Sequence, residues 1–104
     1  MSEYVIIITT TDSEENAKTL SASLVKDRLV ACAQRTRIES TYEWEGAIQE
    51  EPEFLILLKT NKANQEEAMK ALQAQHTYDE PEIIVVPIAD GSAGYLGWID
   101  RVTN

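Results

Sequence analysis

The sequence predicts a single α+β domain in which two helices cover one face of an antiparallel sheet. Three observations support this. The chain has 104 residues, which is about the length of one domain, so we assign residues 1–104 to one domain. Hydrophobic residues make up 43% of the chain, too many for a disordered protein. Strand-like and helix-like segments follow one another in the order βαββαβ, with a short helix at the end.

The first strand is expected from Tyr4 to Thr10. Its almost continuous apolar run is typical of a strand that is central in the sheet or covered on both faces. Thr11 and Asp12 are candidate N-caps, since a glutamate follows each of them at the capping-box spacing. A helix is then expected from about Ser13 to Arg28. Its sheet-facing residues share helical spacing: Ala17, Leu20 and Leu24.

A long hairpin is expected next. The segment Val30 to Trp44 is extended, and its alternate residues Ile38, Ser40, Tyr42 and Trp44 share one face. Glu45-Gly46 is a plausible hairpin turn, and the return strand runs from about Ala47 to Thr60. Because proline cannot donate to a strand ladder, Pro52 marks an edge or a bulge.

Asn61 can cap a second helix that ends near His76. Pro81 precedes a strand from Ile83 to Ile88, and Ser92 can cap a short final helix. The order predicts two right-handed crossovers and one hairpin, which together form a ferredoxin-like antiparallel sheet. This fold hosts many functions, so it does not decide the function.

The hairpin is too long for a compact monomer. About fourteen extended residues at roughly 3.4 Å each reach about 45 Å, whereas a domain of this size is roughly 34 Å across. The hairpin should therefore project beyond its sheet and carry Tyr42, Trp44 and Ile48 into water. Apolar strand ends of this kind are usually covered by a partner, so we expect subunits that contact one another through their strands.

The composition argues against several classes of protein. The net charge is −9, which disfavours binding to nucleic acid. The only basic cluster is expected to be a solvated or ion-paired surface: Lys26, Arg28, Arg35 and Arg37. The apolar runs are too short to cross a bilayer, so no membrane partner is expected. Met1-Ser2-Glu3 shows no signal-peptide pattern, which favours the cytoplasm.

The chain has one cysteine and one histidine. Cys32 therefore cannot form an internal disulfide, and we favour a small buried side chain there. A closed zinc site of Cys and His ligands is excluded in practice. No serine lies in a nucleophile-elbow pattern, and no nucleophile and base are brought together, so we do not expect an enzyme.

Two acidic segments could bind a cation. The segment from His76 to Glu82 lies between a helix and a strand, and it offers His76, Asp79, Glu80 and Glu82 as ligands for Cu(II) or another weakly held divalent cation. Alternatively, His76 simply suits a helix C-terminus. The hairpin acids could hold a cation if they converge, but we favour a solvated acidic rim: Glu43, Glu45, Glu50, Glu51 and Glu53.

Several motifs together resemble the CutA family of divalent-cation tolerance proteins. They are Leu29-Val30-Ala31-Cys32-Ala33, Ser40-Thr41-Tyr42-Glu43-Trp44-Glu45-Gly46, Leu58-Lys59-Thr60, His76-Thr77-Tyr78 with Pro81-Glu82-Ile83-Ile84, and Gly91 with Tyr95-Leu96-Gly97-Trp98-Ile99. The resemblance covers essentially the whole chain, in order.

The resemblance implies a homotrimer, similar in architecture to the PII signalling proteins, that takes part in tolerance of divalent metals, copper especially. It also implies that several residues line clefts between subunits: Cys32, Tyr42, Trp44, Lys59, Tyr78, Tyr95 and Trp98. Copper-binding members can carry a further Cys and His where this chain has Thr9 or Thr10 and Gln75. His76 is then the only retained soft ligand.

Two other functions stay open. One is a PII-like sensor that binds an anionic small molecule through Lys59 or the arginines. The other is a small ferredoxin-like enzyme that uses His76 or Tyr78 as an acid or base.

Overall fold

The computed structural model describes residues 3–104. Met1 and Ser2, which entered the expectation of a cytoplasmic protein, lie outside the described residues. The elements occur in the predicted order: β1 (Tyr4–Thr11), α1 (Glu14–Lys26), β2 (Cys32–Trp44), β3 (Ala47–Asn61), α2 (Lys62–Gln75), β4 (Ile83–Ile88) and α3 (Ala93–Val102).

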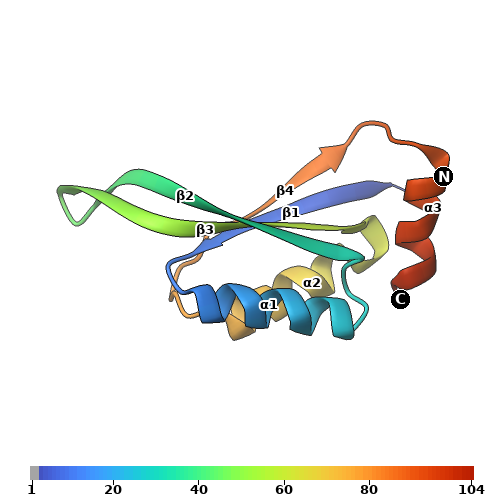
Figure 1. Cartoon of the computed structure of the whole chain (residues 1–104), viewed down its shortest axis with the longest axis horizontal. Helices are drawn as coiled ribbons and strands as arrows, with labels where there is room; N and C mark the ends of the chain where they lie inside the picture. The colour runs from blue at the N-terminus through green and yellow to red at the C-terminus, as the bar shows by residue number, and fades with distance from the viewer. Residues whose placement is uncertain (1–2) are drawn as a thin grey trace.

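The four strands form one antiparallel sheet in the order β2-β3-β1-β4. Figure 1 shows α1 and α2 side by side beneath the sheet, with α3 packed at one end. This confirms the α+β fold and the ferredoxin-like plan. β1 is paired on both sides, by β3 and by β4, so its prediction as a central strand is also confirmed.

The core lies between the sheet and the two helices. Ile7 of β1 is fully buried and pairs with Leu58 of β3, which is also fully buried. From the helix side, the residues predicted to face the sheet are all fully buried: Ala17, Leu20 and Leu24. Burial of apolar side chains on this scale is the main favourable contribution to folding.

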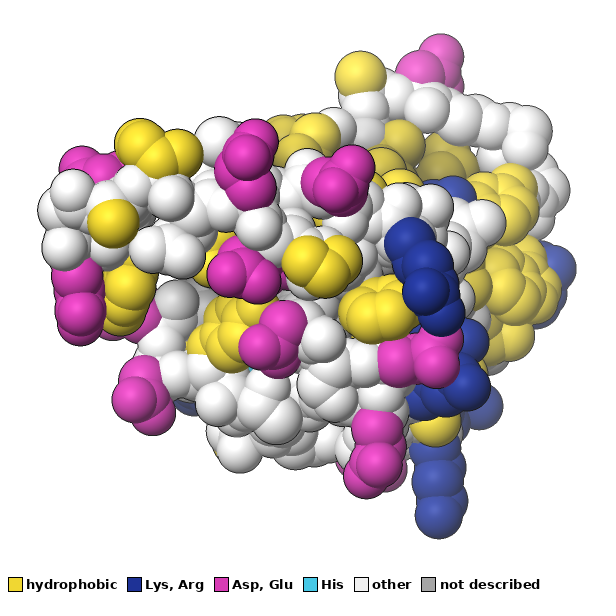
Figure 2. Space-filling view, turned by 60° about the vertical axis from the view of Figure 1, so that its left-hand side comes forward, with side chains coloured by type: hydrophobic (Ala, Val, Ile, Leu, Met, Phe, Trp, Pro, Cys, Tyr) yellow, Lys and Arg dark blue, Asp and Glu magenta, His cyan; other side chains and the backbone are white. Residues whose placement is uncertain are grey.

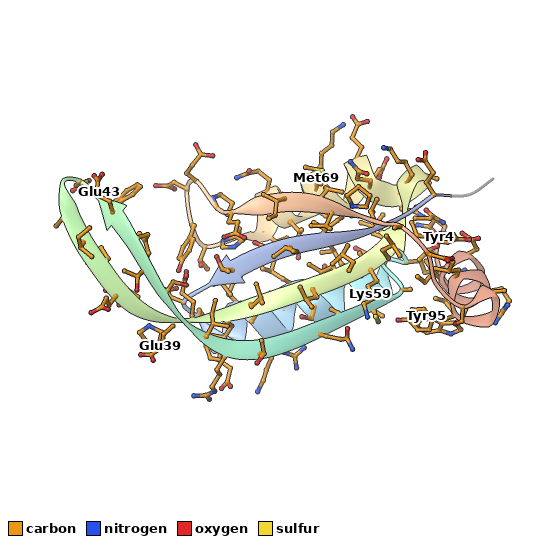
Figure 3. The ribbon with its side chains drawn as sticks, turned by 90° about the horizontal axis from the view of Figure 1, so that it is seen from above. Tyr4, Glu39, Glu43, Lys59, Met69 and Tyr95 are labelled. Atoms are coloured by element: carbon orange, nitrogen blue, oxygen red, sulfur yellow. The ribbon has the colours of Figure 1, made fainter. Side chains whose placement is uncertain are left out.

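The opposite face of the sheet is apolar too, although neither α1 nor α2 covers it. Because side chains alternate along a strand and paired residues share a face, the register groups Ile6, Ile8, Leu55, Leu57, Ile84 and Val86 on this side. We call this set the open face, and Figure 3 looks down onto it. Ile84 and Val86 keep 49% and 41% of their surface exposed.

The start of α1 differs from the prediction. Its N-cap is Ser13, whose Oγ accepts a hydrogen bond from the backbone nitrogen of Asn16 at 3.0 Å, and not Thr11 or Asp12. The Thr11 hydroxyl is used in the preceding turn, where it accepts from the Ser13 nitrogen and donates to Asn16 Oδ1. The helix ends at Lys26, before the predicted Arg28, because Arg28 has a φ of 61°, which is outside helical geometry.

The remaining local predictions concern the caps of α2 and α3 and the role of Pro52. The Asn61 side chain caps α2 by accepting from the Asn64 nitrogen at 3.2 Å. Ser92 precedes α3, but its side chain makes no capping bond. Pro52 faces Glu39 in an unbroken β2–β3 register, beyond the end of β1. Pro52 therefore marks an edge and not a bulge.

The β2–β3 hairpin projects from the molecule as predicted. β1 pairs with β3 only from Phe54 onward, so residues 38–53 form a two-stranded extension, which we call the arm (Figure 1, left). Its turn residues Glu45 and Gly46 have φ angles of 51° and 81°, as a type I′ turn requires. The molecule measures 45 × 25 × 21 Å. Three large apolar side chains of the arm are exposed: Tyr42, Trp44 and Ile48.

Candidate functional site

A groove of about 630 Å³ lies between the arm and the loop that joins α2 to β4. The arm contributes the side of the groove that contains Tyr42 and Trp44, and the loop contributes Tyr78 and the acids that follow it. The residues that line it are Thr10, Ser40, Thr41, Tyr42, Trp44, Glu53, Tyr78, Asp79, Glu80 and Glu82.

Glu53 links the arm to the loop. It is the first residue of β3 beyond the pairing with β1, and only 7% of it is exposed. The Tyr78 hydroxyl donates a hydrogen bond of 2.7 Å to Glu53 Oε2. Burial, this bond and the charge of Glu53 raise the pKa of Tyr78. The expectation that Glu53 belongs to a solvated acidic rim is therefore wrong, although the other four hairpin acids are exposed.

His76 is held by the backbone on both sides of its ring. Its Nδ1 accepts a hydrogen bond from the Tyr78 nitrogen at 3.0 Å, so Nε2 carries the proton and donates to the Thr10 carbonyl at 2.8 Å. The imidazole thus fixes the start of the loop against the end of β1. Its ring also lies 5.0 Å from the Tyr78 ring.

The pKa of His76 is lowered below its ordinary value of 6.5, mainly because burial disfavours the charged ring. The Thr10 carbonyl and the charges of Asp12 and Glu53 oppose this effect without overcoming it. Acidic residues follow His76 closely in the sequence, at Asp79, Glu80 and Glu82, yet the net shift of its pKa is downward. Protonation would also place a hydrogen on Nδ1 against the Tyr78 N–H group.

We expect the free energy of unfolding to fall as the pH is lowered from 7.5 through 6.5 to 5.5. The histidine of the unfolded chain binds a proton near pH 6.5, whereas that of the folded chain has a lower pKa. The folded state therefore becomes less stable relative to the unfolded state as the pH falls through this window. His76 is the only histidine, so the effect can be assigned. Urea denaturation of the wild type and of His76→Gln should show a shallower pH dependence for the variant. Equal slopes would contradict the assignment.

The predicted metal ligands are only partly brought together. Asp79, Glu80 and Glu82 line the groove, whereas His76 does not. Within residues 3–104, no three His, Cys, Asp or Glu side chains gather closely enough to hold a metal ion. The assignment of His76, Asp79, Glu80 and Glu82 as ligands stays a prediction.

The predicted cleft residues form two groups. Tyr42, Trp44 and Tyr78 line the groove, while a second group lies near α3 at the other end of the sheet: Cys32, Lys59, Tyr95 and Trp98. Figure 3 shows Lys59 and Tyr95 close together, far from Glu43 at the arm tip.

The α3 group is built around Tyr95. Cys32 pairs with Lys59 in the β2–β3 register, and its Sγ lies 3.5 Å from the Tyr95 hydroxyl. The bond to Cys32, together with burial, raises the pKa of Tyr95 to about 12. The Lys59 ammonium lies 5.6 Å from the centre of the Tyr95 ring. Cys32 is half-buried next to Tyr95, so it is less buried than the small buried side chain that was favoured.

The basic residues belong mainly to a solvated, ion-paired surface. Arg37 pairs with Glu14 at 3.2 Å and lies 5.2 Å from the centre of the Phe54 ring. In the view of Figure 2, acidic side chains spread over the half that carries the arm, while lysines and arginines gather on the other side. None of the helices formed by residues 3–104 combines the length and apolarity needed to span a bilayer.

Sequence reasoning missed four parts of the groove: Thr10, Ser40, Thr41 and Glu53. One signal for Glu53 was available, because it lies in period-two phase with Leu55 and Leu57, which belong to the open face. A carboxylate in phase with apolar residues of a strand should point toward the sheet face and not into bulk water.

Comparison with known proteins agrees with this architecture. Residues 5–102 match the model of the family described as "CutA1 divalent ion tolerance protein". The chain is 38% identical over its whole length to the divalent-cation tolerance protein CutA of Thermus thermophilus, all of which it covers. It is also 38% identical to the chloroplastic protein CutA of Arabidopsis thaliana, although there it spans only 56% of that protein and 96% of itself.

Among solved structures, the divalent ion tolerance protein CutA1 of Ehrlichia chaffeensis superposes with a TM-score of 0.95. It is 32% identical, and the match covers 100% of this chain and 98% of that one. Sequence, family model and fold agree over the same residues. The chain therefore belongs to the CutA1 family of divalent ion tolerance proteins.

Proposed function

We propose that the protein works as a homotrimer in the response to divalent metal ions, and that it binds a weakly held metal ion or a small ligand in clefts between its subunits. The observation that carries the proposal is the open face. Its central residues Ile8, Leu57 and Ile84 lie side by side in register, and neither α1 nor α2 covers them. A continuous apolar sheet face of this kind is usually buried against a partner.

The arm supports the same proposal. It exposes 58% of Trp44 and 71% of Ile48, at positions that no third strand of the same chain reaches. A second copy of the chain offers complementary apolar surface, and closed rotational symmetry would bury the open face and the arm together. Sedimentation equilibrium at micromolar concentration should give three times the chain mass. A mass of 11.7 kDa would refute the trimer.

The proposed metal binding is weak. Exposed Asp79, Glu80 and Glu82 offer oxygen ligands, but the Nδ1 lone pair of His76 already accepts the Tyr78 N–H. A copper ion must break this hydrogen bond before His76 can ligate it. Copper should still bind before manganese or zinc at a nonselective site.

Calorimetry should therefore give a dissociation constant for Cu(II) weaker than about 1 μM, equivalent to roughly 8 kcal/mol of binding free energy. Lowering the pH from 8 to 5 should release the metal, because protons compete for the ligands. His76→Ala should weaken binding further, while Glu67→Gln, at an exposed position of α2 outside the groove, serves as a control. Nanomolar affinity in His76→Ala would show that the metal ligands lie elsewhere.

Two alternatives have less support. A PII-like sensor of anionic ligands would have to use Lys59 near α3, since four of the ten groove-lining residues are acidic and none is basic. An enzyme would require a free acid or base, but both ring nitrogens of His76 are hydrogen-bonded and the Tyr78 hydroxyl donates to Glu53. We therefore propose a binding protein without catalytic activity, located in the cytoplasm, with no nucleic-acid or membrane partner.

A further inference from the structure

The charged residues that line the groove are all acidic. Glu53 lies against Tyr78, and Asp79, Glu80 and Glu82 follow along the loop. None of the residues that line the groove is a lysine, arginine or histidine. The chain as a whole carries a net charge of −9, so its long-range field attracts cations and repels anions.

The groove is also aromatic. Tyr42 and Trp44 come from the arm and Tyr78 from the opposite loop. In the single chain, Tyr42 keeps 41% of its surface exposed and Trp44 keeps 58%. An ammonium group that lies over a tyrosine or tryptophan ring is attracted by the ring electrons, and a neighbouring carboxylate adds to that attraction.

Glu53 has hydrogen-bonding capacity to spare. It is 7% exposed, and its Oε2 accepts from Tyr78. Within residues 3–104, no side chain or backbone group donates to its Oε1. Glu53 Oε1 is not among the buried side-chain oxygens that lack a partner, so it reaches the surface of the groove. An N–H donor from a ligand would supply the missing bond.

The size of the groove and the spacing of its polar side chains favour an organic cation over a metal ion. A volume of about 630 Å³ lies within the range of small-molecule sites and far exceeds what one bare metal ion fills. No three metal-ligating side chains of the described residues converge around a point, as dedicated metal sites require. Aromatic rings are poor metal ligands but good partners for alkylammonium groups.

We propose that this groove binds an organic ammonium cation, with one ammonium group at Glu53 and the alkyl chain against the rings of Tyr42, Trp44 and Tyr78. This inference rests on the proposed function, in that it names the class of small ligand the cleft takes. A second ammonium group would lie near Asp79, Glu80 or Glu82, so aliphatic diamines fit the arrangement better than monoamines.

The test uses the full chain, isothermal calorimetry in low salt, and 1,4-diaminobutane as the probe. The neutral 1,4-butanediol has the same chain length and serves as the matched ligand control. We expect the diamine to bind with saturation at one site per chain and the diol not to bind. Added salt should weaken binding of the diamine, since the attraction is largely electrostatic.

Two pairs of variants locate the site. Glu53→Gln should lower the affinity for the diamine about tenfold or more, which corresponds to roughly 1.4 kcal/mol of binding free energy. Glu67→Gln changes the net charge equally, on an exposed position of α2 outside the groove, and should have little effect. Tyr42→Leu should weaken binding by about two- to fivefold, whereas Tyr42→Phe, which keeps the ring, should not.

Three outcomes would overturn the inference. They are no diamine binding at millimolar concentration, equal binding of diol and diamine, or equal losses in Glu53→Gln and Glu67→Gln. Sedimentation of the same samples keeps the two proposals apart. A trimer without diamine binding refutes the ammonium site alone, and a monomer that binds the diamine refutes the trimer alone.

Discussion

Val86→Glu is expected to turn the proposed homotrimer into monomers. Val86 lies on β4 within the open face and keeps 41% of its surface exposed in the single chain. A glutamate there can remain hydrated in an isolated subunit, so the fold should survive. In an assembly the same carboxylate would be buried against apolar side chains without a partner, which costs several kcal/mol. Repeated at each symmetric contact, this cost should exceed what a small interface can offset.

Val25→Glu is the matched control. Val25 lies near the end of α1, on the helix side of the molecule, and is 40% exposed. The substitution adds the same charge to a residue of the same type and the same exposure, away from the open face. Sedimentation equilibrium should give a monomer for Val86→Glu and an unchanged mass for Val25→Glu. Full assembly of Val86→Glu would mean that the open face is not the contact surface.

Asn61→Ala is expected to lower the free energy of unfolding by about 2–4 kcal/mol, a large effect for a polar residue. Its Oδ1 accepts from the backbone and the side chain of Asn64, and its Nδ2 donates to Asp100 Oδ1 at 2.8 Å. Losing the cap of α2 costs about 1 kcal/mol. Asn64 is buried, and its side-chain amide would lose its bond to Asn61 Oδ1, which costs about 1–3 kcal/mol more.

Ser13→Ala separates these two contributions. Ser13 caps α1 through a single bond to the Asn16 nitrogen and makes no link to another helix that compares with Asn61. Ser13→Ala should therefore lower the free energy of unfolding by only about 1 kcal/mol. Urea denaturation at one fixed protein concentration measures both variants. Equal losses in the two variants would show that the side-chain contacts of Asn61 contribute nothing beyond the cap.

The fold could be predicted from the sequence because the strand and helix patterns are strong and their boundaries carry clear signals. Asn61 and the Glu45-Gly46 turn are local features, and the structure uses both as expected. The start of α1 could not be settled in this way. Thr11, Asp12 and Ser13 are all good capping residues, and only the turn geometry decides that the Thr11 hydroxyl bonds to Ser13 and Asn16 instead.

The candidate groove was harder to predict. The sequence pointed to the arm and to the loop after α2 separately, because each contains aromatic and acidic residues. It could not show that Glu53 meets Tyr78, since that contact depends on where the hairpin leaves the sheet relative to the loop. The direction in which the pKa of His76 shifts could not be predicted from the sequence, for a related reason. Neighbours in sequence are acidic, but burial, which is a property of the folded chain, decides the direction of its pKa.

The long hairpin also bears on how quickly each part of the sheet can form. Every β2–β3 pair lies around one tight turn, from Trp44 with Ala47 outward to Cys32 with Lys59, so pairing can propagate from the turn with little loop-closure entropy. Isolated hairpins close within about 1–10 μs. Pairing of β1 with β4 joins the two ends of the chain, as Tyr4 with Ile88 shows, and such long-range contacts form slowly. Pulsed hydrogen exchange during refolding should therefore protect the amides near the turn before those of β4, even though most residues of the arm are exposed to water.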